Sequence, residues 1–234
     1  MKLGIMQPYF MPYIGYWQLM NLVDKYVIYD DVNFIKGGWI NRNRILVNGE
    51  PKYFNVPMLG ASPNLRINEV RVDHNEAIIR KNLRILEAAY KKAPYYDIVY
   101  PMLENILWCG EDNIAKYIEH SFRVLCEYLD IETELVVSSD LDKDNTLKRQ
   151  DKVIAICRLL GATEYYNAIG GQELYSFEAF RKNGVQLHFV KTKNIVYSQF
   201  ENEFQPSLSM IDVMMFNSKN RIKEYLEAYT LLTD

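Results

Sequence analysis

Residues that could bind a ligand or move a proton gather in three N-terminal stretches of the chain. An aromatic stretch runs from Gln7 to Tyr16, two carboxylates follow at Asp30 and Asp31, and Trp39 to Arg44 alternates asparagine with arginine. Aromatic faces stack on rings, guanidinium groups bind phosphate or carboxylate, and carboxylates accept protons. The combination predicts a pocket for a small molecule that carries phosphate, such as a nucleotide or nucleotide-sugar.

The aromatic stretch follows the first expected strand. Leu3 to Met6 is apolar, and a loop that contains Pro8 and Pro12 separates it from a helix that begins at Pro12 or Tyr13. A loop that only turned the chain would favour Gly, Asn or Ser over Tyr-Phe-Met-Pro-Tyr, although each ring alone could be core packing. Loops after strands and helix N-termini bind anions in α/β proteins. The candidate ligand-binding residues here are Gln7, Tyr9, Tyr13, Gly15 and Tyr16.

The alternating stretch predicts an anion clamp on a hairpin. Asn48-Gly49 between apolar runs is a strong hairpin signal. Side chains alternate along a strand, so Arg42 and Arg44 should share one face. The alternative is an exposed strand with solvated charges, but Asn-Arg-Asn-Arg is a poor strand former, which favours binding. The candidates are Lys36, Trp39, Asn41, Arg42, Asn43 and Arg44.

The two carboxylates end the second expected strand, Tyr26 to Tyr29. Adjacent side chains in an extended chain point in opposite directions, so one of the pair should face the site. Asp30 and Asp31 are the catalytic candidates, with Asp30 the first choice as general base. The alternative for either is an aspartate that caps a turn or helix.

A second wall of the pocket is expected after a short strand at 164–167. Successive glycines expose backbone amides that can hold an anion or the edge of a sugar, although Gly-Gly is more often a simple turn. The polar and aromatic neighbours favour binding. The candidates are Asn167, Gly170, Gly171, Gln172 and Tyr175.

Composition limits the class of protein. The 234 residues are 49% hydrophobic and 24% charged with a net charge of −3, which fits a globular protein and offers no basic surface for duplex nucleic acid. Neither a secretory signal nor an apolar run long enough to span a membrane is present, so the cytoplasm is the expected compartment. Oligomeric state is not indicated.

Cysteine and histidine spacing predicts neither disulfides nor a tightly bound metal. Cys109, Cys126 and Cys157 lie in apolar helical patterns and should be reduced core residues. The three histidines are scattered without metal-ligand spacing. No cofactor is indicated, and Mg²⁺ would be needed only for nucleotidyl transfer.

The order of elements predicts an α/β fold. Strands and helices alternate at both ends, and helical patterns fill the middle, so we expect one domain over 1–234 with a helical insertion around 75–130. Asn64 to Val72 should be extended, and Met210 to Leu232 helical.

Six segments resemble those of the WbqC-like protein family, which is found with bacterial O-antigen and other surface-polysaccharide genes. They are Met6-Gln7-Pro8-Tyr9-Phe10, Pro12-Tyr13-Ile14-Gly15-Tyr16, Tyr29-Asp30-Asp31-Val32, Trp39-Ile40-Asn41-Arg42-Asn43-Arg44-Ile45, Gly170-Gly171-Gln172-Glu173-Leu174-Tyr175 and Leu208-Ser209-Met210-Ile211-Asp212. The resemblance implies a transferase acting on a sugar or nucleotide-sugar in polysaccharide synthesis, with an aminoacyl group, glycine in particular, as the group moved.

Two alternative functions remain open. Tyr13-Ile14-Gly15-Tyr16 is similar in position to the His-x-Gly-His motif of HIGH-superfamily nucleotidylyltransferases, with tyrosine at both histidine positions. This spacing suggests a Rossmann-like sheet of that type and, as one alternative, nucleotidyl transfer. The other alternative is a non-catalytic ligand-binding subunit, although a scaffold would have no need of polar residues at strand ends.

Overall fold

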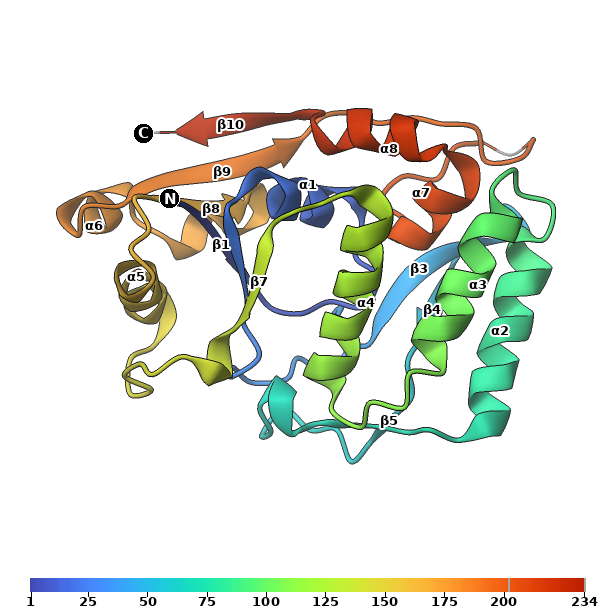
Figure 1. Ribbon diagram of the computed structural model, residues 1–234, viewed down its shortest axis with the longest axis horizontal. Helices are drawn as coiled ribbons and strands as arrows, with labels where there is room; N and C mark the ends of the chain where they lie inside the picture. The colour runs from blue at the N-terminus through green and yellow to red at the C-terminus, as the bar shows by residue number, and fades with distance from the viewer. Residues whose placement is uncertain (202, 234) are drawn as a thin grey trace.

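Six strands form a mixed sheet at the centre of the computed structural model, which describes residues 1–201 and 203–233 (Figure 1). The spatial order is β10-β9-β8-β1-β2-β7; β10 is antiparallel to β9 and the other neighbours are parallel. The bounds are β1 (Lys2–Met6), β2 (Lys25–Ile28), β7 (Glu134–Val137), β8 (Glu164–Ala168), β9 (Gln186–Thr192) and β10 (Tyr229–Thr233).

The order of the strands reverses at β1. The chain runs outward from β1 to β2 and β7, then returns to the other side of β1 for β8 and β9. Met6 pairs with Ile28 at the carboxyl ends of β1 and β2, and the Tyr29 amide donates to the Met6 carbonyl at 2.8 Å. In doubly wound sheets the crevice at such a reversal is where ligands bind. The loops after β1, β2 and β8 therefore border the expected crevice.

Helices cover both faces of this sheet. On one face, α5 (Arg149–Leu159) and α6 (Phe177–Lys182) pack on side chains such as Val27. On the other, α1 (Ile14–Leu22), α4 (Ile114–Leu129) and α8 (Lys219–Leu226) share a core with Tyr26 and Ile28. The side chain of Val27 points to one face of the sheet and those of Tyr26 and Ile28 to the other, because side chains alternate along a strand. Figure 1 shows α5 and α6 apart from the α1, α4 and α8 side.

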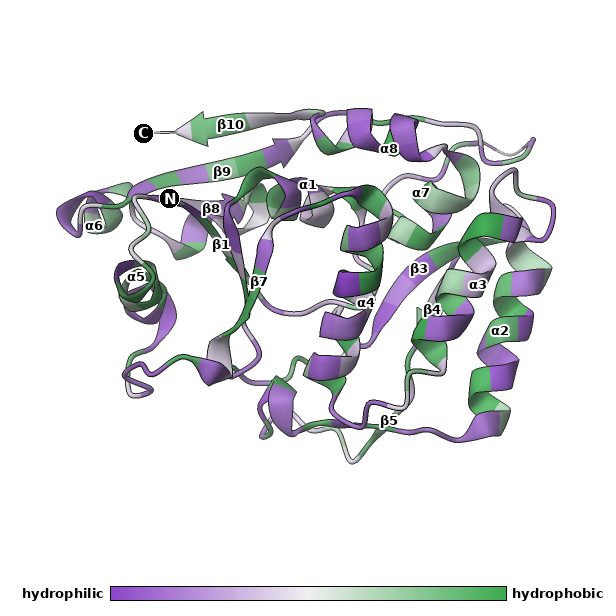
Figure 2. Cartoon of the chain, in the orientation of Figure 1, coloured by the Kyte–Doolittle hydropathy of each residue, from purple (hydrophilic) through white to green (hydrophobic). Residues whose placement is uncertain are grey.

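A smaller unit packs beside α4. Its hairpin joins β3 (Arg42–Val47) to β4 (Glu50–Asn55) through Asn48 and Gly49, both at positive φ, as a type I′ turn requires. Figure 2 shows hydrophilic and hydrophobic residues mixed along its helices, as expected where one side is buried. The remaining elements of the chain are β5 (Met58–Leu59), β6 (Arg71–Val72), α2 (Glu76–Tyr90), α3 (Tyr96–Leu107), α7 (Met210–Phe216) and the 3₁₀ turns η1 (Ile67–Glu69), η2 (Ser138–Asp140) and η3 (Ile169–Leu174).

The α/β prediction, the hairpin and the helices expected between 75 and 130 are confirmed. Two expectations were wrong. Segment 64–72 contains η1 and only the two-residue strand β6, because the Glu69 carboxylate accepts from the Arg66 amide at 2.7 Å and caps a turn. The expected helix from Met210 to Leu232 is α7, α8 and β10. Ser218 caps a new helix, and the aromatic and β-branched end of the chain pairs with β9.

All three cysteines are free thiols. Burial raises the pKa of Cys126 and of Cys157 to about 12, so both stay protonated at neutral pH. We expect dithiothreitol to leave the melting temperature unchanged, as measured by calorimetry with and without the reductant. A marked fall in the melting temperature would contradict the assignment of three free thiols. Cys126 and Cys157 are buried as expected, whereas Cys109 is only partly buried, so its prediction as a core residue was wrong.

Candidate functional site

Three segments far apart in the sequence line a pocket of about 340 Å³ beyond the carboxyl end of β1. They are the loop between β1 and α1, the start of the β3 ribbon and the segment before α7. Its volume lies in the range of small-molecule sites. Five of its seven lining residues are among the sequence candidates, and Pro12 and Ser207 are additional. The seven are Tyr9, Pro12, Tyr13, Trp39, Asn43, Arg44 and Ser207, which we call the Arg44 pocket.

Backbone hydrogen bonds fasten the three segments together. The Ser209 amide donates to the Arg44 carbonyl at 2.8 Å, and the Met210 amide donates to the Pro12 carbonyl at 3.0 Å. The Phe10 amide donates to the Ile40 carbonyl, also at 3.0 Å. These backbone hydrogen bonds between the three segments hold the walls of the pocket together without a ligand.

Arg44 gives the pocket its electrostatic character. One terminal nitrogen, Nη2, donates to the Ser207 carbonyl at 3.3 Å, and the guanidinium carbon lies 5.9 Å from the centre of the Trp39 ring. The Arg44 Nε is buried and has no hydrogen-bond partner among the described residues. A buried donor without an acceptor is unfavourable. Because no carboxylate lines the pocket, an anionic group of a ligand is the natural acceptor.

Aromatic rings form the other walls. Tyr13 and Trp39 expose 37% and 40% of their surface, which is high for such large side chains. Burial raises the pKa of Tyr9 and of Tyr13, so both hydroxyls are neutral and can donate or accept a hydrogen bond. The pocket can thus stack a sugar or base while Arg44 binds an attached phosphate or carboxylate.

Arg42 lies on the same strand face as Arg44, as alternation predicts, but it does not line the pocket. Its Nε donates to the Gly38 carbonyl at 3.0 Å, its Nη2 to that of Gly37, and its guanidinium lies 4.3 Å from the centre of the Tyr53 ring. Arg42 thereby holds the loop that carries Trp39. Among the other clamp candidates, Lys36 is exposed and Asn41 donates to the Val56 carbonyl at 2.9 Å, so neither lines the pocket.

Gln7, Gly15 and Tyr16 do not line the Arg44 pocket but contact residues near it. Tyr16 is buried, and its hydroxyl donates to the Gln7 carbonyl at 2.8 Å. The Tyr9 hydroxyl lies 3.4 Å from the Gln7 side-chain oxygen. A Cβ on Gly15 would lie 2.4 Å from the Thr192 hydroxyl oxygen and 2.5 Å from the Tyr13 ring, so this position requires the close approach that glycine allows.

Asp30 points away from the Arg44 pocket. Its carboxylate accepts from the Ser139 amide at 2.9 Å, the Ser139 hydroxyl at 2.6 Å and the Asn68 side chain at 3.1 Å. Asp30 and these partners help to line a separate hollow of about 210 Å³ at the ends of β2 and β7. One carboxylate thus joins η1 and η2 to the end of β2.

Asp31 points the opposite way, as alternation predicts. Its Oδ2 lies 2.8 Å from the Lys152 ammonium nitrogen and 3.0 Å from that of Lys143, and its Oδ1 accepts from the Ser138 hydroxyl at 2.8 Å. Burial opposes ionisation, but hydrogen bonds from Lys152, Ser138 and Lys143 outweigh it and lower the pKa of Asp31. A carboxylate held in this way is a weak base at neutral pH.

The glycine loop after β8 lies on the α5 side of the sheet. The Asn167 side chain donates to the Tyr165 hydroxyl at 2.5 Å, and a Cβ on Gly171 would come within 2.6 Å of the Asn167 side-chain oxygen. A Cβ on Gly170 would meet open space, and Gln172 is exposed. Tyr175 packs edge-on against Tyr165. None of these lines the Arg44 pocket.

The sequence candidates therefore separate into two groups. Tyr9, Tyr13, Trp39, Asn43 and Arg44 meet at the Arg44 pocket, whereas Asp31 and the β8 loop lie on the α5 side. Lys143 and Lys152 escaped the sequence analysis because lysines in a polar loop and at a helix start are usually solvated. Ser207 also escaped it; its positive φ of 56° is visible only in the structure.

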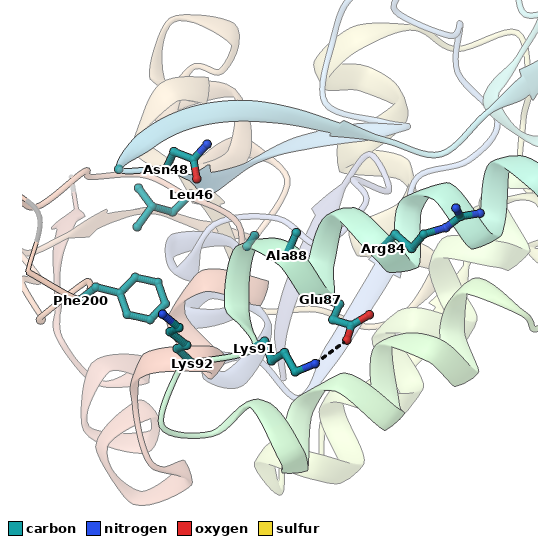
Figure 3. A pocket seen from close by; sticks show the side chains of 10 residues that line it. Leu46, Asn48, Arg84, Glu87, Ala88, Lys91, Lys92 and Phe200 are labelled. Carbon is teal, nitrogen blue, oxygen red and sulfur yellow. Dashed lines mark hydrogen bonds and ion pairs between the residues drawn. The ribbon is translucent and has the colours of Figure 1, made fainter.

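A hollow of about 500 Å³ lies between the β3–β4 turn and the end of α2 (Figure 3). Its charged side chains do not converge on one point. Arg84 extends away from Phe200, and Lys91 pairs with Glu87 at 3.0 Å. Functional pockets place a few polar groups toward one ligand, so the Arg44 pocket is the stronger candidate although it is smaller.

Residues 1–201 and 203–233 contain neither a cluster of metal ligands nor a membrane-spanning helix. No three or more His, Cys, Asp and Glu side chains are arranged to hold a metal ion. No helix within these ranges is both long and apolar enough to cross a bilayer.

Fold and pocket define a doubly wound α/β protein with an aromatic, arginine-containing pocket beyond the first strand. The chain belongs to the WbqC-like protein family, whose sequence pattern matches residues 7–224. It is similar to an uncharacterized protein of Mycobacterium tuberculosis, Rv1507c, with 25% identity over 228 residues that cover 96% of this chain and 97% of the relative. No solved structure matches the chain significantly.

Proposed function

We propose that this protein is a cytoplasmic transferase that acts on a sugar or nucleotide-sugar during O-antigen or other surface-polysaccharide synthesis. The group moved is an aminoacyl group, glycine in particular. The pocket supports binding of such a substrate, and the choice of reaction rests on the family resemblance. Tyr9, Tyr13 and Trp39 stack the sugar or base, and Arg44 binds the attached phosphate.

The observation that carries this proposal is the unpaired Arg44 Nε beside exposed aromatic rings. A buried guanidinium nitrogen that served the fold alone would have its hydrogen bond satisfied. An anion bound here would accept from Nε and one terminal nitrogen together, in the bidentate geometry that suits phosphate or carboxylate.

Of the two candidate catalytic carboxylates, we assign proton removal to Asp30. A general base acts within hydrogen-bond reach, so the group that loses the proton would bind in the hollow at the ends of β2 and β7, not in the Arg44 pocket. The lysine pair that lowers the pKa of Asp31 makes that carboxylate the weaker base. Three donors occupy part of the Asp30 carboxylate, and among the described residues Oδ1 accepts a hydrogen bond from the Ser139 amide alone. A carboxylate oxygen has two lone pairs, so Oδ1 retains one for a proton.

The decisive experiment is incubation of the protein with amino acids, nucleotides and nucleotide-sugars, followed by mass spectrometry of the products. A sugar or nucleotide-sugar heavier by an aminoacyl residue would support the proposal. Binding of a nucleotide-sugar without any product would instead indicate a ligand-binding subunit.

Arg44→Ala should raise the Kd of a phosphate-containing ligand, because a charged hydrogen bond contributes about 1.5–3 kcal/mol, roughly 10- to 150-fold in affinity. Arg42→Ala is the matched control. It removes the same charge two residues away but loosens only the Gly37–Gly38 loop, so its effect should be the smaller. Calorimetry that found Arg44→Ala unchanged would remove Arg44 from the binding site.

The strand order favours a second candidate, a nucleotidylyltransferase of HIGH-superfamily ancestry. The Tyr13-Ile14-Gly15-Tyr16 segment opens α1 directly after the β1 loop of a doubly wound sheet. However, Tyr16 is buried, so only Tyr13 of the two motif tyrosines could reach a phosphate. Release of pyrophosphate from ATP or CTP in the presence of Mg²⁺ would establish this alternative.

A further inference from the structure

Two buried lysines share one carboxylate at the carboxyl end of β2. The side chains of Lys143 and Lys152 expose only 3% and 8% of their surface, and the Asp31 side chain exposes 3%. Asp31 is the one carboxylate with which either lysine forms an ion pair among the described residues. Two positive charges thus face one negative charge in a place that water hardly reaches.

Such an imbalance is costly unless a further anion completes it. A buried charge is tolerated when it is paired, and removal of its partner is strongly unfavourable. Each ammonium group has three donors. Lys152 directs hydrogen bonds to the Asp31 carboxylate and carbonyl, and Lys143 to the Asp31 carboxylate and the Ser138 carbonyl. Each therefore has a donor beyond these two acceptors.

The surroundings add to the positive potential. Lys152 lies in the first turns of α5, whose N-cap, Lys148, makes no side-chain cap. The start of a helix carries a partial positive charge. The only acidic residue in that first turn is Asp151, which is exposed and lies at the surface.

The position in the fold also points to a ligand. Tyr29 follows β2 beside the end of β1, and the Lys152 ammonium lies 5.1 Å from the centre of its ring. Tyr29 and Tyr175 pack against the same buried cluster on the α5 side, so the β2 and β8 loops approach each other here. Burial, and then the nearby charge of Asp31, raise the pKa of Tyr29. These loops flank β1, where the strand order reverses.

We propose that Lys143 and Lys152 form an anion site, distinct from the Arg44 pocket, that takes a phosphoryl group on the α5 side of the crevice. The anion balances the one positive charge of the two lysines that Asp31 does not neutralise. It enters past the loop that carries Lys143, where Asp142 and Asp144 are exposed. Asp31 acts as the counter-ion that holds both ammonium groups in place.

The test measures the Kd of inorganic phosphate by calorimetry at constant ionic strength, with chloride as the background anion. Lys152→Met should raise the Kd about 10- to 100-fold, the loss expected for one charge-assisted hydrogen bond. Lys143→Met replaces it if that variant does not fold. Lys182→Met is the matched control, because Lys182 pairs only with Glu178 on the surface of α6, and the Kd should not change.

Asp31→Asn gives the sharper result. If the lysines only neutralise Asp31, the wild-type protein should already bind phosphate no better than chloride. If they form an anion site, Asp31→Asn should lower the Kd, because a second positive charge becomes available. Arg44→Ala should not alter phosphate binding at this site, which separates it from the proposed function. The proposal is overturned if phosphate binds no better than chloride, if both lysine variants bind as wild type does, or if Asp31→Asn weakens binding.

Discussion

Asp212→Ala is expected to lower the free energy of unfolding by about 2–5 kcal/mol, because a buried hydroxyl that loses its acceptor costs about 1–3 kcal/mol. Asp212 is fully buried at the start of α7. Its carboxylate accepts from the Tyr90 hydroxyl at 2.9 Å, the Tyr197 hydroxyl at 2.7 Å and the Gln199 side chain at 2.7 Å. The buried Tyr90 and the partly buried Tyr197 would therefore lose their acceptor, as urea unfolding would show.

The matched control is Tyr197→Phe, which removes one hydroxyl and leaves the other two donors to Asp212. It should cost only about 0.5–1.5 kcal/mol, the net value of a single hydrogen bond. Equal losses in Asp212→Ala and Tyr197→Phe would show that the carboxylate does not organise the network.

Asp212 should also leave a signature in the pH dependence of stability. Burial raises its pKa above the usual value of 3.8, against the lowering effect of its three donors. The native state then binds the proton more tightly than the unfolded chain does. The stability that this tighter proton binding adds to the native state is therefore fully present below about pH 3.8. It is lost as the pH rises through the raised native pKa of Asp212. Asp212→Asn should remove this slope.

The Asp212 network also stabilises the binding site. Asp212 lies in the first turn of α7, directly after Ser209, whose amide holds Arg44 and whose hydroxyl donates to the Met11 carbonyl at 2.7 Å. The spacing from Ser209 to Asp212 fits a local capping box. The Ser209 cap is present, since its hydroxyl accepts from the Ile211 amide. The carboxylate, however, turns to tertiary partners that no local pattern could reveal.

Patterns that act over a few residues predicted their elements well. The Asn48-Gly49 turn and the apolar periodicity of α2 to α4 depend on backbone geometry and on one buried face, both of which are local. The sequence predicted a helix from Met210 to Leu232, but Tyr229 to Thr233 forms β10. Its conformation is decided by pairing with β9, a contact from a distant part of the chain.

The same distinction applies to the candidate site. Alternation placed Arg42 and Arg44 on one face, but only tertiary packing shows that Arg42 turns to the Gly37 and Gly38 carbonyls while Arg44 enters the pocket. Tyr16 is of a residue type that often binds ligands, but it is buried in the core. Which polar group meets a ligand thus depends on what already satisfies it in the fold.

Asp30→Asn should lower turnover by about 10²–10⁴-fold, the usual contribution of a general base. The same change should lower the free energy of unfolding by about 1–3 kcal/mol, because an asparagine places an NH₂ group against donors. Both Asp30 oxygens accept hydrogen bonds from Ser139 or Asn68, so either orientation of the amide loses an acceptor. Turnover must therefore be measured at a temperature and urea concentration at which the variant is folded.

Two controls separate the chemical role of Asp30 from its structural one. Asn68→Ala removes one donor to the same carboxylate and keeps the base, so it should reduce stability with little loss of turnover per folded molecule. Asp31→Asn removes the neighbouring charge from the α5 side, where the lowered pKa makes the carboxylate a weak base, and should have the smaller effect on turnover. Asp30 would be a purely structural carboxylate if Asp30→Asn were less stable but retained wild-type turnover. If Asp31→Asn were the more damaging of the two, the base would lie on the lysine side of the sheet, beside the proposed phosphoryl site.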